Sequence, residues 1–299
     1  MNMSIYVEKL LSMGAAADVL MSRMTTFKIG GKADLFIEPS NSRELQEILS
    51  VAKEGQIPVT VIGGGSNLLV SDNGVEGLVI RIGDKMSAVE QVGNVFSVGA
   101  GILLSSLTKE TIRRGYMGLE WAGGIPGRLG GAVAMNAGAY GYEIKPLLSS
   151  VEYIENGEVC SKKVEDADMG YRKSIFAQNN RIVVSAVIEL LKDDGGAKDR
   201  MIEMNNKRKN SQPLAYPSAG SVFKRPEGYF AGKLVEDANL KGVSVGGAQV
   251  SEKHAGFIIN TGSATCKDVL DLIAHIKKTV FEKDGVMLEE EVRFIGRKM

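Results

Sequence analysis

The first group of residues that could do chemistry is a glycine cluster at residues 61–68, with the sequence VIGGGSNL. Because three consecutive glycines carry no Cβ atoms, successive backbone N–H groups can converge on one anion, typically a phosphate. Ser66 and Asn67 can add side-chain donors. No helical pattern and no Lys-Ser/Thr pair follow, so the cluster matches neither the dinucleotide fingerprint nor a Walker A loop. A tight turn between two strands would explain the cluster equally well.

A second glycine cluster fills residues 122–141, with the sequence AGGIPGRLGGAVAMNAGAYG. Pro126 suits the first turn of a helix, and free N–H groups at such a helix start would favour a phosphate. Gly130 and Gly131 would let another backbone or a ring approach closely. A glycine-rich helix-packing motif is the alternative. Two such clusters in one chain favour a bound pyrophosphate over two unrelated turns.

Periodic patterns around the first cluster predict a β-α-β unit. Residues 33–38 alternate as in a strand, and Asn41 with Glu44 three residues later is typical of a helix N-cap. One face of the predicted helix carries Leu45, Ile48, Leu49 and Ala52. Residues 57–62 are β-branched and predict the second strand, which leads directly into the first glycine cluster.

The rest of the chain predicts an α/β (α+β) protein with two domains. Strands are expected at 75–82, 95–98 and 182–190, a helix at 103–114, a long amphipathic helix from about 265 to 285, and a final strand at 287–295. Residues 192–198, KDDGGAK, form a polar stretch typical of a boundary. We therefore expect one domain over 1–194, with subdomains at about 1–82 and 83–194, and a smaller one over 195–299.

Composition excludes several classes of protein. The 299 residues carry 36 Lys+Arg and 36 Asp+Glu, and this balance argues against nucleic acid or membrane lipid as the main partner. The two cysteines lie far apart and the two histidines are too few for a His-based metal site, so no metal is expected. The N-terminus lacks the pattern of a signal peptide, and no apolar run reaches the length of a membrane span. We expect a cytoplasmic protein.

The two clusters together resemble the FAD-binding part of the UDP-N-acetylenolpyruvoylglucosamine reductase (MurB) family. Further motifs of that family follow in order, from about Thr26 to Gly296: Y-R-x-S-x-F at 171–176, GSVFK at 220–224, KLVE at 233–236, GGAQVS at 246–251, HAGFIIN at 254–260 and L-x-x-E-V-R at 288–293. Each motif is weak alone, but the ordered set is specific.

The resemblance implies a two-part FAD-binding domain of the vanillyl-alcohol-oxidase (PCMH) type and a smaller C-terminal α+β domain that binds the substrate. The short spacing from Arg172 to Ser221 resembles the subgroup that lacks an extra loop with a tyrosine over the substrate. Position 225 is Arg where some members carry Asn. The residues that bind the UDP portion are therefore not assigned from the loop-containing subgroup.

The resemblance also implies an enzyme, UDP-N-acetylmuramate dehydrogenase, which serves peptidoglycan synthesis, cell wall biogenesis, cell shape and cell division. NADPH would pass hydride to non-covalent FAD, and flavin N5 would pass it to the methylene carbon of the enolpyruvyl ether of UDP-N-acetylglucosamine. The carbon beside the carboxylate then needs a proton, and the developing dianionic enolate needs positive charge. The small-molecule substrate is the partner expected, with no nucleic acid, membrane or obligate protein partner.

Three residues are implied as catalytic: Ser221 as the proton donor, Arg172 as a bidentate clamp on the substrate carboxylate, and Glu291. Two roles stay open for Glu291, a hydrogen bond to the carboxylate or a proton relay. Tyr171 is expected to line the substrate pocket and Lys224 to supply positive charge. Without the resemblance, these would be a turn serine, a surface arginine and a solvated acidic strand.

The residues expected to hold FAD come from both clusters. They are Gly63, Gly64, Gly65, Ser66, Asn67 and Leu68 from the first, and Gly124, Ile125, Pro126, Gly127, Gly130, Gly131, Asn136, Ala137, Gly138 and Ala139 from the second.

Two other functions remain open. One is an oxidase on the same flavin fold that acts on an alcohol or phenol; many of these attach FAD covalently through His, and the first His in this chain is His254. The other is a non-catalytic FAD-binding subunit of a redox complex. Such a subunit would not need Arg172, Ser221 and Glu291 together.

Overall fold

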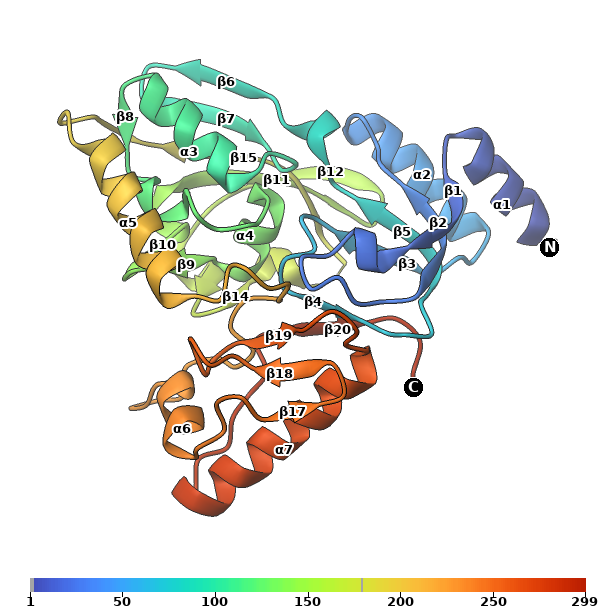
Figure 1. Ribbon diagram of the computed structural model, residues 1–299. Coiled ribbons are helices and arrows are strands. Elements are labelled where there is room, and N and C mark those ends of the chain that lie inside the picture. The colour runs from blue at the N-terminus through green and yellow to red at the C-terminus, as the bar shows by residue number, and fades with distance from the viewer. Residues whose placement is uncertain (1–2, 179) are drawn as a thin grey trace. The chain divides into compact units, whose positions relative to one another are not determined.

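The computed structural model describes residues 3–178 and 180–299 and divides into two compact units, each with its own hydrophobic core (Figure 1). Unit 1 contains the chain up to Ala17, Leu35–Gly64 and Gly77–Lys207; unit 2 contains Asp18–Asp34, Gly65–Glu76 and Arg208–Met299. Two segments from the N-terminal half of the chain therefore pack with its C-terminal part. The functional domains expected at 1–194 and 195–299 stay a prediction.

The β-α-β unit predicted around residues 33–62 is present. It consists of β2 (Lys32–Ile37), α2 (Ser42–Glu54) and β3 (Val59–Ile62), and α1 (Met3–Ser12) packs against α2. The Asn41 side chain accepts a hydrogen bond from the N–H of Glu44, which caps α2. The sheet has the order β1-β2-β5-β3, with β1 at Ala16–Leu20 and β5 at Val75–Arg81, and β3 runs parallel to β5.

The larger sheet of unit 1 has five strands in the order β12-β11-β15-β7-β6, and the pairings are antiparallel. The strands are β6 (Val89–Val92), β7 (Val95–Gly99), β11 (Leu148–Glu155), β12 (Glu158–Lys163) and β15 (Ile182–Glu189). The short helix α4 (Leu129–Met135) packs on β15, the central strand (Figure 1). The helical part of the second glycine cluster therefore packs on the central strand of this sheet.

Short elements complete unit 1. They are α3 (Leu104–Arg113), β8 (Tyr116–Met117), β9 (Gly138–Ala139), β10 (Tyr142–Glu143), β13 (Met169–Gly170), β14 (Lys173–Ser174), β16 (Leu191–Lys192) and the first turns of α5 (Ala197–Ser211). The 3-10 turns are η2 (Asp84–Met86), η3 (Glu120–Ala122), η4 (Lys145–Leu147), η5 (Asp166–Asp168) and η6 (Ile175–Ala177). Trp121, Phe96 and Phe176 are fully buried in the unit.

Unit 2 is built on the long helix α7 (Cys266–Asp284), which packs against β17 and β18 (Figure 1). The sheet has the order β17 (Ser244–Val245), β18 (Ala248–Val250) and β19 (Ile258–Asn260); α6 (Ala231–Asp237) and η1 (Met21–Arg23) are the other helical segments. A capping box between Thr265 and Asp268 begins α7, and Gly285 ends it with φ +69°. The buried face consists of Val269, Leu272, Ile273 and Ile276, as the spacing predicts, together with Cys266 and Val280.

The final strand is shorter than the sequence suggests. Only β20 (Arg293–Ile295) is a strand, and it runs parallel to β4 (Leu68–Val70) from the first glycine cluster. Upstream, the N–H groups of Glu291 and Val292 both point to the carbonyl oxygen of Val222, at 2.7 and 3.3 Å. Residues 287–292 form no strand apart from an isolated bridge between Glu290 and Phe223, so the expected strand over 287–295 is wrong in its first six residues.

Candidate active site

The two glycine clusters, predicted separately, lie against each other within unit 1. A Cβ atom built on Gly64 would lie 3.4 Å from the carbonyl oxygen of Pro126 and 3.6 Å from the Cα of Gly127. The nearest atom to a Cβ on Gly63 is the Cβ of Arg128, at 3.7 Å. The structure therefore brings two stretches of nearly bare backbone together, as a ligand with a pyrophosphate would require.

The remainder of the first cluster, residues 65–68, belongs to unit 2. Gly65 has φ +63°, and a Cβ there would lie 2.2 Å from the carbonyl oxygen of Met24. Only glycine fits such a position without a shift of the backbone. Asn67 donates through Nδ2 to the carbonyl oxygen of Glu291, at 3.0 Å, so its amide is engaged by the protein.

Gly130 and Gly131 are neighbours in α4 but face different surroundings. A Cβ on Gly130 would lie 3.0 Å from the Cβ of Ala100, so this glycine permits close packing of the helix. A Cβ on Gly131 would have no atom within 4 Å. The open space beside the helix is therefore on the Gly131 side. Bare backbone next to open space is compatible with a bound FAD.

The start of α4 differs from the expectation. The helix begins at Leu129 rather than at Pro126. Its first two N–H groups donate to the carbonyl oxygens of Ile102 and Ala100, at 3.0 and 2.8 Å. The expected free N–H groups at this helix start are therefore wrong for these two residues, because a neighbouring turn supplies their acceptors.

Arg128 is a residue that the sequence analysis missed. Its side chain is only 4% exposed, and Nη1 contacts a carboxylate oxygen of Asp84 at 2.7 Å and also donates to the carbonyl of Gly101. This hydrogen bond lowers the pKa of Asp84. The signal was available: Arg128 is the only charged residue in the segment 122–141. It ties the second cluster to the turn that carries Asp84.

Arg172 lies in a two-residue turn between β13 and β14, a hairpin that pairs Gly170 with Lys173. Its backbone is left-handed, with φ +54°, which is rare for a residue other than glycine. Its Nη2 donates to the carbonyl oxygen of Gly138 at 3.2 Å, and its Cζ lies 5.1 Å from the ring centroid of Tyr171. The hairpin therefore brings Arg172 and Tyr171 to the end of the second cluster.

Ser221 and Glu291 lie on two backbone segments of unit 2 that meet at Val222. Val222, next to Ser221, accepts hydrogen bonds from the N–H groups of Glu291 and Val292. Ser221 itself forms a bridge with Phe257, and its Oγ donates to the carbonyl oxygen of Phe223 at 3.2 Å. The segment at Ser221 thus lies between the HAGFIIN motif and the C-terminal motif.

Lys224 forms an ion pair with Glu289, and the N–H of Lys224 donates to the Glu289 carbonyl at 2.8 Å. A second pair joins Lys277 of α7 to Glu290, at 2.8 Å. In the acidic run at 289–291, Glu289 and Glu290 therefore each form an ion pair with a lysine. The positive charge expected from Lys224 is balanced by Glu289, a partner that the sequence analysis did not assign.

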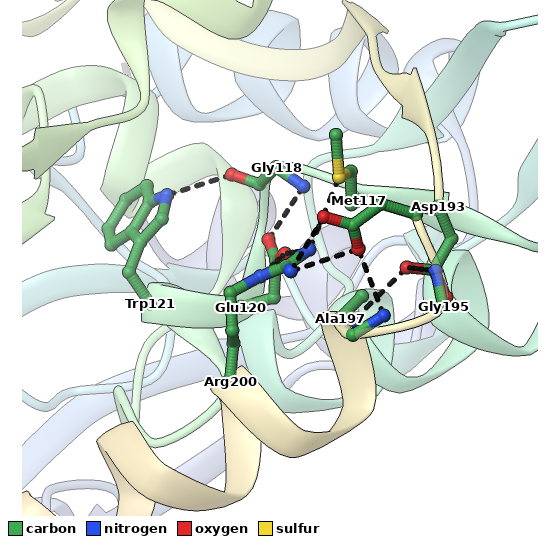
Figure 2. Close-up of polar contacts among 10 residues, drawn as sticks. Met117, Gly118, Glu120, Trp121, Asp193, Gly195, Ala197 and Arg200 are labelled. Carbon is green, nitrogen blue, oxygen red and sulfur yellow. Dashed lines mark hydrogen bonds and ion pairs between the residues drawn. The ribbon is translucent and has the colours of Figure 1, made fainter.

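A cluster of polar contacts surrounds η3, the turn at the start of the second glycine cluster (Figure 2). The Glu120 side chain is 9% exposed and accepts hydrogen bonds from the N–H of Gly118 at 2.6 Å and from Arg200 at 3.0 and 3.1 Å. Arg200 also contacts both oxygens of Asp194, and Trp121 donates to the Gly118 carbonyl. A cavity of about 260 Å³ opens here, lined by Met117, Gly118, Glu120, Trp121, Tyr142, Leu191, Asp194, Arg200 and Met204.

Cys266 and His254 have structural surroundings. Cys266 is fully buried, and burial raises the pKa of its thiol to about 12, so it is no nucleophile. His254 accepts the N–H of Gly256 on Nδ1 at 3.1 Å, and burial lowers its pKa. Within 3–178 and 180–299, no group of His, Cys, Asp and Glu has the arrangement of a metal site. Over the same residues, no helix has both the length and the apolar character needed to cross a membrane.

Comparison with known families identifies the class. Residues 33–160 match the family model of an FAD-binding domain, and residues 212–295 match that of the C-terminal domain of UDP-N-acetylenolpyruvoylglucosamine reductase. Together with the relatives described next, these matches show that the chain is an enzyme of the flavin-dependent oxidoreductase class.

Relatives along the whole chain identify the family. The reductase of Clostridium novyi (strain NT) is 46% identical over 283 residues, 94% of this chain and 92% of that protein. The reductase of Clostridioides difficile (strain 630) is 44% identical over 301 residues and 99% of each chain. The crystal structure of MurB from Thermus caldophilus matches with a TM-score of 0.80 and 36% identity over 93% of this chain and 97% of that one. The chain belongs to the UDP-N-acetylenolpyruvoylglucosamine reductase family, which confirms the resemblance and the expected fold class.

Proposed function

We propose that this enzyme reduces the enolpyruvyl ether of UDP-N-acetylglucosamine to UDP-N-acetylmuramate in the cytoplasm, with NADPH as the hydride source. The observation that carries the proposal is the junction at Val222, whose carbonyl binds the Glu291 segment beside Ser221. Two groups able to handle a proton are thereby fixed on adjacent backbone segments of one unit. A subunit that only stored a flavin would not require this junction.

FAD, when bound, supplies the capacity to accept and deliver hydride. We assign its binding to the backbone of both glycine clusters, with Gly131 beside open space and Gly63 and Gly64 against the backbone of the second cluster. These glycines leave room for a pyrophosphate and a ring to approach the main chain. The side-chain amide of Asn136 holds protein groups instead, so any contact that Asn136 makes with the cofactor would involve its backbone.

Ser221 delivers the proton to the carbon next to the substrate carboxylate. A serine hydroxyl is a weak acid in water, but a dianionic enolate is a strong base. In this structure the hydroxyl donates to the Phe223 carbonyl, so the hydroxyl must turn away from that carbonyl before the transfer. The Phe223 carbonyl orients the hydroxyl in the absence of substrate.

Arg172 binds the substrate carboxylate and stabilises the enolate. Its planar guanidinium holds a carboxylate by two parallel hydrogen bonds and favours charge that develops in the transition state. The stacked Tyr171 ring restricts the guanidinium and lines the pocket. Glu291 orients the carboxylate or relays the proton, while Lys224, balanced by Glu289, adds a modest positive field.

The test is a two-step anaerobic assay. The purified protein should be yellow, NADPH should bleach its flavin absorption, and the enolpyruvyl nucleotide should restore it. Product formed in deuterated water should carry deuterium at the carbon next to the carboxylate, in one configuration. Reoxidation by air coupled to alcohol turnover, with no response to the nucleotide, would instead favour an oxidase.

A further inference from the structure

The end of the second glycine cluster and the Arg172 hairpin are joined by three hydrogen bonds at alternate residues of the cluster, 134, 136 and 138. Ser174 Oγ donates to the carbonyl oxygen of Ala134 at 2.8 Å. Asn136 Nδ2 donates to the carbonyl oxygen of Gly170 at 3.0 Å, and Arg172 Nη2 donates to that of Gly138 at 3.2 Å. The two segments lie 34 to 40 residues apart in sequence but are joined by hydrogen bonds within unit 1.

Asn136 is at the centre of this junction. It is fully buried and left-handed, with φ +46°, at the end of α4. Besides Gly170, its Nδ2 contacts Glu143 Oε2 at 2.9 Å, and its Oδ1 accepts the N–H of Lys145 at 3.2 Å. Asparagine tolerates this backbone and supplies two donors and an acceptor. Glycine would keep the backbone and lose every side-chain bond, whereas aspartate would lose both donors.

The turn that carries Arg172 needs such support. Its two arms are held at Gly170 by Asn136 and at Ser174, which is 3% exposed, by Ala134. A left-handed arginine persists only where the surroundings over-determine the backbone. Because the Cα–Cβ bond of Arg172 follows from that backbone, the two anchors set where its side chain starts, and the Gly138 carbonyl and the Tyr171 ring then restrict the guanidinium.

We infer that Asn136 is a positioning residue, which holds the Arg172 turn so that the guanidinium meets the carboxylate of the substrate. The inference rests on the proposed function, since it assumes that Arg172 binds this carboxylate. It assigns the side chain of Asn136 to the substrate half of the site, whereas the sequence alone suggested the cofactor half.

Two ligands separate this role from a general structural one. UDP-N-acetylmuramate carries the lactyl carboxylate, and UDP-N-acetylglucosamine lacks it. In Asn136→Gly we expect the dissociation constant of the first to rise by roughly tenfold or more, as for a misplaced charge-assisted contact, and that of the second to change by less than about twofold. Reoxidation of the reduced enzyme by the enolpyruvyl nucleotide should slow by about 10²-fold, with flavin reduction by NADPH unchanged.

Two further variants control the measurement. Ser174→Ala removes the other anchor of the same turn without changing any residue expected to contact FAD, and should show the same selective loss to a smaller degree. Asn156→Gly is the matched control, because Asn156 also has a left-handed backbone, φ +55°, but lies exposed in the turn between β11 and β12. It should bind both nucleotides as the wild type does.

The outcomes are distinct. Selective loss of the carboxylate-bearing ligand in Asn136→Gly and Ser174→Ala supports the positioning role. Wild-type affinity for both ligands overturns it, as does an equal loss for both. If Asn136→Gly loses FAD while Ser174→Ala binds both nucleotides normally, the positioning role is overturned in favour of a cofactor role for Asn136. A wild-type protein that neither binds nor reduces the nucleotide would refute the proposed function itself.

Discussion

The side-chain amide of Asn67 donates to the backbone carbonyl of Glu291, with Nδ2 3.0 Å from the oxygen, across 224 residues of sequence. The N–H of Arg293 donates back to the Asn67 carbonyl at 2.9 Å. Asn67→Ala should therefore reduce the free energy of unfolding by about 1 kcal/mol, since a part-buried carbonyl loses its donor. Asn73→Ala is the control, because its bond to the Lys298 carbonyl is exposed. Urea denaturation of both variants measures the difference, and equal midpoints would contradict the expectation.

Substitutions at neighbouring glycines of α4 should have different consequences. Gly131→Val places its side chain in open space and should lower FAD affinity at least tenfold, about 1.4 kcal/mol, while the thermal midpoint of the apoprotein changes little. Gly130→Val meets Ala100 and should lower that midpoint. Gly64→Val should also lower FAD affinity, but its side chain meets the Pro126 carbonyl, so the midpoint should fall as well. Denaturation of the wild type should release all of its flavin as FAD. Full FAD occupancy in Gly131→Val would remove this loop from the cofactor site.

Arg172→Ala should slow only the step that involves the substrate carboxylate. We expect reoxidation of the reduced enzyme by the enolpyruvyl nucleotide to fall by roughly 10²–10³, the scale of one lost donor to a developing oxyanion. Reduction by NADPH should keep its rate. Stopped-flow absorbance follows both steps, and equal slowing of the two would point to general damage.

Ser221→Ala should also spare flavin reduction, because no proton reaches the substrate carbon in that step. Transfer to the enolpyruvyl group should fall by at least about 10²-fold, the lower end of what a positioned general acid contributes. Ser221→Cys keeps a proton donor with a larger atom and should recover part of the rate. Stopped-flow reoxidation at the wild-type rate in Ser221→Ala would exclude this residue as the acid and leave Glu291 as the candidate.

Glu120 and Asp194 both bind Arg200, but only Glu120 is buried. Glu120→Gln should lower the free energy of unfolding by about 1–3 kcal/mol, because a buried NH₂ group would face Arg200 or the N–H of Gly118. Asp194→Asn, whose side chain is 55% exposed, should leave the midpoint nearly unchanged. Thermal and urea denaturation of the two variants give the comparison. A larger effect at Asp194 would mean that burial does not decide the contribution.

The sequence by itself determined the features that depend on neighbouring residues. The caps at Asn41 and Thr265 and the apolar faces of α2 and α7 follow from spacings of three and four residues, which one helix satisfies alone. The glycine clusters and the ordered motifs likewise carry the resemblance to the family within the sequence itself. Local geometry is encoded locally, so these predictions needed no knowledge of the fold.

Tertiary structure decided which groups became partners. Gly130 and Gly131 are adjacent identical residues in the sequence. In the structure, Gly130 packs closely against Ala100, whereas Gly131 lies beside open space. The acceptors in the turn at 100–102 occupy the first two N–H groups of α4, and the N–H groups of Glu291 and Val292 share the Val222 carbonyl just before the short last strand. Asn136 and Gly170 meet only because the chain folds back between them. Partners separated by tens of residues leave no periodic signal, since their contact depends on the path of the whole chain.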